Sequence, residues 1–516
     1  MWCRWLCALL VAVLACLLGL LSFLVDLGTS PPRHHEVLVQ TSEQYKVIPR
    51  ATEAEGLPVL VLMTEAINAA MVTHALLVAD AAKPFFEVHL ASFGGAYAKL
   101  LEQSEFQSPG SRETMQEKSY KSSSELQELQ VFMLGHDCIM RCHLSGPKNK
   151  AIYAADQFES FSNPYTEVLH EQIASSLHLY STIRPSAVAA FFVLSASISA
   201  RIARLPLFVD MSRASMTREY ATEPKAIAAS IADDGVVTKM GLRMTMSHVA
   251  SWLMKRMTFI AGPFEAAARE WNITGIHLIW DLMEGDYTVI SDIPSWVGVD
   301  EKKLPPQVTY VGPLYGKLKM EIPPEVMELR EKATQEGQPL IWFAMGSSGQ
   351  PPLVLSILRE LLRQQPTWFV IAPVHTLLKG VGIDSADQHA LVEAGLASDR
   401  LFIPSSLLPS HRVEPLCDAA LTHGGQGTVH TSMCSGVPFV GVGMMPEQDL
   451  NIRLAAEKGM ALQAMKTDHP SQVAGLMKQL VESKEMRVKA LKIKEQCQEF
   501  TGEHAFVNLI REVTKS

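Results

Sequence analysis

The sequence lacks an excess of basic residues, which limits the partners that it can bind. It has 45 Lys and Arg against 54 Asp and Glu, giving a net charge of −9. Proteins that bind the phosphate backbone of nucleic acids usually carry a basic excess on one face. The bias typical of disordered chains is absent too, with 47% hydrophobic and 19% charged residues. We therefore expect a folded protein that does not bind nucleic acid.

Cysteine is scarce, with eight in 516 residues. This number is too small for a disulfide framework in a chain of this length. Cys138 and Cys142, with His136 and His143 beside them, suggest a metal cluster, but no second Cys/His pair follows at the spacing of zinc ligands. The pattern favours unpaired thiols and surface histidines, and we expect no metal site.

The N-terminus contains a long apolar run. Residues 5–25 (WLCALLVAVLACLLGLLSFLV) carry no charge, and as a helix at ~1.5 Å per residue they would span a hydrocarbon core of ~30 Å. A signal peptide usually has a shorter apolar core and a small-residue cleavage site, so a retained anchor is favoured. The charges that flank this segment weakly favour an orientation with the N-terminus in the cytoplasm and the body of the protein in the lumen. There Asn272-Ile273-Thr274 would be a glycosylation acceptor.

The remaining chain is long enough for two domains, and its apolar runs are typical of buried parallel strands. Such runs alternate with helical patterns in both halves, which predicts two doubly wound α/β domains. Proline and glycine interrupt the pattern between residues 312 and 324. We expect an anchor at 1–27, a linker at 28–56, a first domain at 57–318 and a second domain at 319–516. The strand-like runs are 58–63, 188–192, 205–209, 340–344, 368–371, 418–422 and 438–442.

A glycine-rich turn follows one of these strands. Residues 421–428 read LTHGGQGT, and the predicted helix after them continues through Cys434. Glycines let the backbone approach a ligand closely, and the start of a helix offers unpaired N–H groups and a partial positive charge. A tight structural turn would use the same residues, so the pattern alone does not separate this from a diphosphate-binding site.

Two further segments are expected at the same edge of the sheet. Gly346-Ser347-Ser348-Gly349 follows the first strand of this domain, and Glu447, Gln448 and Asn451 follow another. Ligands of doubly wound sheets bind where the strands end. Carboxylate and amide groups suit the hydroxyls of a sugar, although Glu447 and its neighbours alone could also be a helix cap.

At this point the residues resemble a known family. The run from His423 to Asn451 is similar to the nucleotide-sugar signature of the UDP-glycosyltransferase superfamily, His-Gly-Gly-x-Gly-Thr, then Gly-Val-Pro, then Asp/Glu-Gln-x-x-Asn. Weaker similarity covers residues 310–314, residues 345–348 and the opening strand and helix. The resemblance implies the GT-B fold, in which two Rossmann-like domains face each other across a cleft. It also implies that residues 57–318 form the acceptor domain and residues 319–516 the donor domain.

The resemblance also implies a role for each matching residue. His423, Gly425 and Thr428 would contact the diphosphate, while Glu447 and Gln448 would hold sugar hydroxyls. Charge on the leaving diphosphate would be met by amides, the helix dipole and the histidine, without a metal or a resident cofactor; the chain has no Asp-x-Asp motif. The full set of expected donor residues is Ser347, Ser348, Phe402, His423, Gly424, Gly425, Gly427, Thr428, Glu447 and Gln448.

Departures from the family pattern concern the nucleoside and the catalytic base. Phe402 keeps an aromatic ring for stacking on uracil, but the usual glutamine is absent, and Thr431 replaces the usual ribose-binding glutamate. Ala66 and Ala190 stand where the catalytic His and its Asp partner are expected. Glu65 is a candidate alternative base, although a carboxylate at a helix start has a simpler structural explanation. His74 is expected to be packed or on a helix surface.

These patterns support two hypotheses. The first is a membrane-anchored, inverting, UDP-sugar-dependent glycosyltransferase acting on a hydroxyl of a lipophilic small molecule or lipid, in the endoplasmic reticulum or secretory pathway. The second is a catalytically silent relative that binds a nucleotide sugar or a lipid. A dinucleotide-dependent oxidoreductase is disfavoured, because no Gly-x-Gly-x-x-Gly turn follows the first strand.

Overall fold

We describe the chain from a computed structural model. Several expectations fall outside its described residues: the anchor at 1–27, the Cys138–His143 group, Ala66, and both Ser347 and Ser348. Within the part that is described, no helix is long and apolar enough to cross a membrane. The described residues are 38–39, 57–65, 69–93, 100, 131–133, 166–211, 247–249, 262–297, 304–346, 350–384, 388–393, 395–396, 398–444 and 446–515.

The first large sheet is entirely parallel and has seven strands in the order β4-β3-β2-β5-β6-β8-β9. Apolar clusters cover both of its faces, as expected for strands that are buried on two sides. Its strands are β2 (Val59–Thr64), β3 (Glu87–Ser92), β4 (Val131–Met133), β5 (Ala187–Phe191), β6 (Leu207–Met211), β8 (Tyr287–Ile290) and β9 (Val308–Tyr310).

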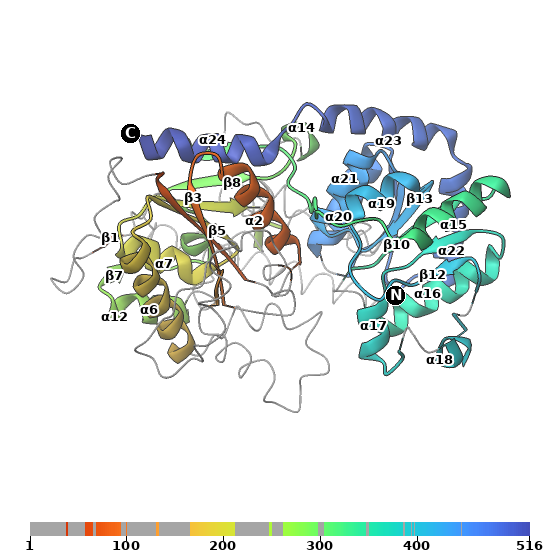
Figure 1. Cartoon of the computed structure of the whole chain (residues 1–516), viewed down its shortest axis with the longest axis horizontal. Coiled ribbons are helices and arrows are strands. Elements are labelled where there is room, and N and C mark those ends of the chain that lie inside the picture. Colours follow the sequence, from red (N-terminus) through yellow and green to blue (C-terminus); the bar gives the residue numbers. More distant parts are fainter. Residues whose placement is uncertain are drawn as a thin grey trace, which may run out of the picture.

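Helices connect these strands and pack on the sheet (Figure 1). A separate two-stranded ribbon pairs β1 (Leu38–Val39) with β7 (Ile273–Thr274). The helices are α2 (Ala69–Ala82), α6 (Thr166–Ile183), α7 (Leu194–Ile202), α12 (Gly262–Glu270), α13 (Trp280–Met283) and α14 (Pro294–Val297).

The second sheet is also parallel, with six strands in the order β12-β11-β10-β13-β14-β15. It too carries an apolar cluster on each face. The expectation of two doubly wound α/β domains is confirmed. The strands are β10 (Leu340–Ala344), β11 (Phe369–Ile371), β12 (Leu401–Phe402), β13 (Ala419–Thr422), β14 (Phe439–Val442) and β15 (Ala461–Ala464).

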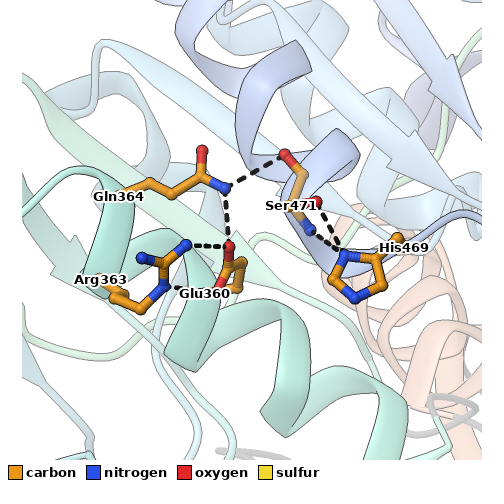
Figure 2. Close-up of polar contacts among 5 residues, drawn as sticks. All are labelled: Glu360, Arg363, Gln364, His469 and Ser471. Atoms are coloured by element: carbon orange, nitrogen blue, oxygen red, sulfur yellow. Dashed lines mark hydrogen bonds and ion pairs between the residues drawn. The ribbon is translucent and has the colours of Figure 1, made fainter.

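The helices of this domain flank the sheet (Figure 1). Figure 2 shows one contact between them, where Gln364 on α16 donates to Glu360 on the same helix and to the carbonyl of Ser471 on α22. His469 caps α22 by accepting from the Ser471 amide. The helices are α15 (Pro324–Gln335), α16 (Pro351–Gln364), α17 (His375–Gly380), α18 (Gln388–Glu393), α19 (Ser410–Val413), η4 (Glu414–Leu416), α20 (Gln426–Ser435), α21 (Pro446–Glu457), α22 (Pro470–Glu482) and α23 (Lys484–Cys497).

The last helix, α24 (Gly502–Lys515), returns to the first domain (Figure 1). Its Phe506 ring lies 6.0 Å from the Phe191 ring and 6.5 Å from the Phe208 ring, centroid to centroid. Arg511 stacks over Phe85 at 3.7 Å. Residues 502–515 fall in the range expected for the second domain, yet they pack on the sheet of the first domain, which ties the two domains together.

Candidate functional site

Three loops of the second domain meet at the carboxyl edge of its sheet. They follow β10, β13 and β14, which are neighbours in the strand order. An ideal Cβ on Gly346, after β10, would lie 2.4 Å from the His423 ring after β13. The loops that the sequence placed at one edge are therefore in direct contact, apart from Ser347 and Ser348, which lie outside the described residues.

The His423 ring occupies a slot between two glycines. Ideal Cβ atoms on Gly346 and Gly425 would each lie 2.4 Å from a ring atom, so neither position accommodates a side chain beside this ring. The ring is buried, and burial lowers the pKa of His423 to about 4. At neutral pH the imidazole is uncharged. Its Nδ1 lies 3.4 Å from the Ala344 carbonyl oxygen.

The glycine turn is fastened to helix α21. Gly424 adopts φ +79°, a left-handed conformation that favours glycine, and a Cβ there would lie 2.5 Å from Ile452. Its carbonyl oxygen accepts from Asn451 Nδ2 at 2.8 Å. Asn451, at the end of the third station of the signature, therefore helps to hold the glycine turn in place.

Helix α20 begins directly after this turn. Gly425 is its N-cap, no side chain caps the helix, and the first intrahelical bond runs from the Val429 amide to the Gly425 carbonyl. The amides of a first helical turn have no acceptor within the helix and carry a partial positive charge. Gly427 and Thr428 are half-buried at this end. The arrangement can bind an anionic oxygen without a side-chain charge.

Glu447 and Gln448 lie in the first turn of α21 and already have partners within the protein. Gln448 Oε1 accepts from the Met444 amide at 2.9 Å, and Glu447 Oε1 accepts from Asn451 Nδ2. Both side chains therefore help to shape the loop after β14. Sugar binding by Glu447 and Gln448 stays a prediction.

Phe402 lies away from these loops. It is on the edge strand β12, two strands from β10, and its half-buried ring packs on the core beneath the sheet. Nothing in the described structure brings this ring to His423. A stacking role for Phe402 stays a prediction.

Glu65 directly follows strand β2 of the first domain, at the carboxyl edge of that sheet. Its side chain is partly exposed, yet desolvation raises its pKa to about 7. A carboxyl group with such a pKa can exchange a proton near neutral pH. The role of Glu65 as a catalytic base stays a prediction.

The first domain also contains a buried His–Asp pair that sequence reasoning missed. His74 Nδ1, on α2, lies 2.8 Å from Asp210 Oδ2 on β6, and neither side chain is more than 1% exposed. Among the described residues, His74 Nε2 has no hydrogen-bond partner. His74 is thus packed, as one of the two expectations held. The sequence feature that could have indicated its partner is Asp210, an aspartate within the otherwise apolar strand Leu207–Met211.

The two halves of the candidate site approach each other. An ideal Cβ on Gly427, in the first turn of α20, would lie 3.6 Å from Ala70 Cβ in the first turn of α2. Glu65 lies five positions before Ala70 in the chain. The N-terminal end of α20 and the start of α2, which follows Glu65 in the chain, therefore lie against each other at the interface between the domains. No metal-binding group of three or more His, Cys, Asp or Glu occurs in the described chain.

Comparison with protein families supports the C-terminal signature. Residues 401–500 match the family model described as "Erythromycin biosynthesis protein CIII-like, C-terminal domain". The chain is 24% identical over 355 residues to a "PGL/p-HBAD biosynthesis glycosyltransferase" of Mycobacterium tuberculosis, which covers 68% of this chain and 75% of the relative. It is 22% identical over 335 residues to a "PGL/p-HBAD biosynthesis rhamnosyltransferase" of Mycobacterium bovis, covering 63% and 66%.

Solved structures share the fold. The glycosyltransferase VinC, solved in complex with dTDP, superposes with a TM-score of 0.58 at 17% identity, covering 88% of this chain and 99% of VinC. The glycosyltransferase SnogD from Streptomyces nogalater superposes with a TM-score of 0.53 at 13% identity, covering 89% and 100%. At such identities the likeness establishes the two-domain architecture alone.

Proposed function

Because the chain belongs to the superfamily of family 1 glycosyltransferases, we propose that it transfers a sugar from UDP-sugar to a hydroxyl group of a lipophilic acceptor, with inversion at the anomeric carbon. The observation that carries this proposal is the contact between the first turn of α20 and the first turn of α2. It places the start of α20 against the start of α2, and the carboxyl group of Glu65, whose pKa burial raises to about 7, lies five positions before Ala70 in the chain.

The donor diphosphate would lie on the first turn of α20. Its oxygens would accept from backbone amides at Gly427 and Thr428, with the helix dipole opposing their charge. His423 is neutral near pH 7 and so would contribute a hydrogen bond and not a charge. Glu447 and Gln448 would hold the sugar, and Phe402 would stack on the base. The donor needs no resident cofactor in this scheme.

The transfer is a single displacement. The acceptor oxygen attacks the anomeric carbon, the bond from that carbon to the diphosphate oxygen breaks, and the electron pair leaves with UDP. The acceptor proton passes to Glu65. Glu65 is preferred over His74 as the base, because the His74 side chain is fully buried whereas the Glu65 side chain is partly exposed. Proton transfer to a positioned base contributes typically ~10² to 10⁴ in rate.

A lipophilic acceptor is supported by the relatives, whose names refer to PGL biosynthesis. The apolar segment at residues 5–25 adds a second argument, because an anchored enzyme meets acceptors that partition into the membrane. We extend the proposal to a membrane-anchored protein of the secretory pathway with a lumenal body. This part rests on residues outside the described structure.

A second function is favoured by one observation. Ala190 is buried within β5 at the place expected for the dyad aspartate, and so cannot support a base. A silent relative that binds nucleotide sugar or lipid would retain the glycine turn and the first turn of α20, residues 424–428, which we call the cradle, and would lose turnover. The donor-binding half of the site is common to both functions, so binding alone does not separate them.

Release of the nucleotide tests the proposal. Purified protein is incubated with a panel of UDP-sugars and dTDP-sugars, with and without extracts of membrane lipids, and free UDP or dTDP is measured. Acceptor-dependent UDP release that Gly425→Val removes would support a UDP-sugar transferase. Release from dTDP-sugars alone would correct the donor. Calorimetric binding of UDP without release under any condition would favour the silent relative.

A further inference from the structure

Helix α20 carries a second set of contacts that the proposed reaction does not use. One turn past the cradle, His430 Nε2 lies 3.2 Å from Asp292 Oδ1, which follows β8 of the first domain. His430 Nδ1 lies 3.2 Å from the Leu314 carbonyl oxygen, in the segment joining the domains. Gln426 Nε2 donates to the Ser291 carbonyl at 3.1 Å. The helix that begins at the cradle is therefore bonded directly to the other domain.

His430 makes both of these contacts inside the protein. The side chains of His430 and Asp292 are fully buried, and each ring nitrogen of His430 lies within hydrogen-bond distance of an oxygen atom. A buried polar group costs free energy unless it is hydrogen-bonded, so each partner depends on the other.

Asp292 is itself held in place by the backbone. Its Oδ1 also accepts from the Ile293 amide at 2.8 Å, at the entrance to α14. Leu314 is fully buried in the core beneath α24. His430 therefore contacts two well-anchored points, one after β8 and one in the interdomain segment. A rigid connection results, because neither anchor is a side chain on an exposed loop.

We propose that His430 is a positioning residue that clamps the cradle helix α20 to the first domain through Asp292 and Leu314. The clamp sets the separation of the two domains before a donor arrives, so the cradle and Glu65 are aligned in the free protein. This inference rests on the proposed function only for the identity of the ligand at the cradle.

The clamp predicts a specific kinetic signature. In wild-type protein the donor meets domains that are already apposed. Without the clamp the binding-competent arrangement is only partly populated, and the apparent donor affinity falls by that fraction. Saturating donor restores the arrangement, so the donor KM rises while kcat is largely retained. A general loss of packing would not produce this split.

The experiment compares His430→Ala and Asp292→Asn with a matched variant, His74→Ala. The matched variant removes an equally buried His–Asp pair that lies within one domain. Small-angle scattering gives the radius of gyration with and without UDP, calorimetry gives the UDP dissociation constant, and thermal unfolding gives Tm. Asp292→Asn keeps the shape of the side chain, and this variant provides the test if His430→Ala fails to fold.

We expect both clamp variants to have an increased radius of gyration without UDP, a decrease towards the wild-type value at saturating UDP, and a UDP dissociation constant raised about tenfold or more. His74→Ala should lower Tm without these changes. The double variant His430→Gln, Asp292→Asn restores one neutral hydrogen bond and should recover part of the compact state.

Unchanged scattering and UDP affinity in both clamp variants, with a lower Tm alone, would show that His430 only supports the fold and would overturn the inference. The nucleotide-free scattering tests the clamp even if the proposed function fails. Wild-type protein that does not bind UDP would remove the donor assignment, while expansion of His430→Ala would still support the clamp.

Discussion

The His423 ring fills the space that a side chain at Gly425 would need. An ideal Cβ on Gly425 would lie 2.4 Å from His423 Nε2 and 3.0 Å from Cε1. The first and third residues of the signature are thus interdependent. Glycine at 425 keeps the ring in its slot and leaves the start of α20 open to a ligand.

This relationship predicts the effect of filling the slot. Gly425→Val should abolish UDP binding, because the added side chain displaces the His423 ring and covers the first turn of α20. Calorimetry measures the affinity, and circular dichroism checks the fold. Gly475→Ala is the matched control, since nothing lies within 4 Å of a Cβ at that position in the same domain. Unaltered UDP affinity in Gly425→Val would remove the cradle from this helix end.

The two nitrogens of His423 can be tested separately. Asn places its amide near Nδ1, which faces the Ala344 carbonyl, whereas Gln reaches towards Nε2, beside Gly425. If Nε2–H donates to the diphosphate, His423→Gln should keep most of the UDP affinity, and His423→Asn should lose it about as fully as His423→Ala. A neutral hydrogen bond contributes ~0.5 to 1.5 kcal/mol, or roughly two- to tenfold in affinity. Equal affinities for all three variants would assign His423 to packing alone.

The sugar assignment predicts a difference between two ligands. Glu447→Ala should weaken binding of UDP-sugar by ~1.5 to 3 kcal/mol, the usual contribution of a hydrogen bond to a charged group, and should affect UDP much less. Titration with each ligand gives the comparison. Glu457→Ala, at the exposed end of the same helix, controls for the loss of a charge on α21. Equal weakening of both ligands would mean that Glu447 acts through Asn451 and the glycine turn.

The base assignment predicts a pH profile. Because the pKa of Glu65 is raised to about 7, the ionised form that accepts a proton increases as the pH rises through 7. The transfer rate should rise over the same range. Glu65→Gln should reduce kcat by ~10² to 10⁴ while sparing UDP binding, since the amide keeps the shape but takes no proton.

His74→Ala discriminates between the two candidate bases. We expect it to lower stability and to leave the acid limb of the profile near pH 7, because that limb belongs to Glu65. Loss of turnover in His74→Ala with full activity in Glu65→Gln would transfer the base role to the buried pair His74 and Asp210.

Because Glu414 is buried, we expect the free energy of unfolding to depend on pH. It is fully buried, accepts a hydrogen bond from Ser432, and burial raises its pKa from 4.5 to about 8. Between these values the folded state binds more protons than the unfolded state, so the free energy of unfolding falls as the pH rises. The slope approaches about 1.4 kcal/mol per pH unit in the middle of that range.

Glu414→Gln should remove this slope, and its stability relative to wild type should increase from pH 5 to pH 8. Urea unfolding at pH 5, 6.5 and 8 gives the measurement. Glu457→Gln, on an exposed side chain, should leave the wild-type slope unchanged. A parallel pH dependence in Glu414→Gln and wild type would show that Glu414 does not hold its proton in the folded state.

Much of the fold could be predicted from local sequence. Apolar runs and the helical pattern between them located both parallel sheets, and LTHGGQGT at residues 421–428 gave the turn between β13 and α20. These features depend on neighbouring residues, because strand and helix periodicity and the conformational freedom of glycine are local properties. The order of loops along one sheet edge follows from parallel topology.

The tertiary structure alone decided which distant polar groups are paired. His74 meets Asp210 across 136 positions, and His430 meets Asp292 across 138. The family pattern led us to expect Ala190 where the aspartate of the catalytic pair usually stands. No pattern in the sequence indicated that Asp210, on the next strand, pairs with His74. Sequence reasoning also could not predict that burial makes His423 neutral, or that α24 packs on the first sheet. Pairing, desolvation and docking depend on which surfaces the folded chain brings together, and no local pattern encodes them.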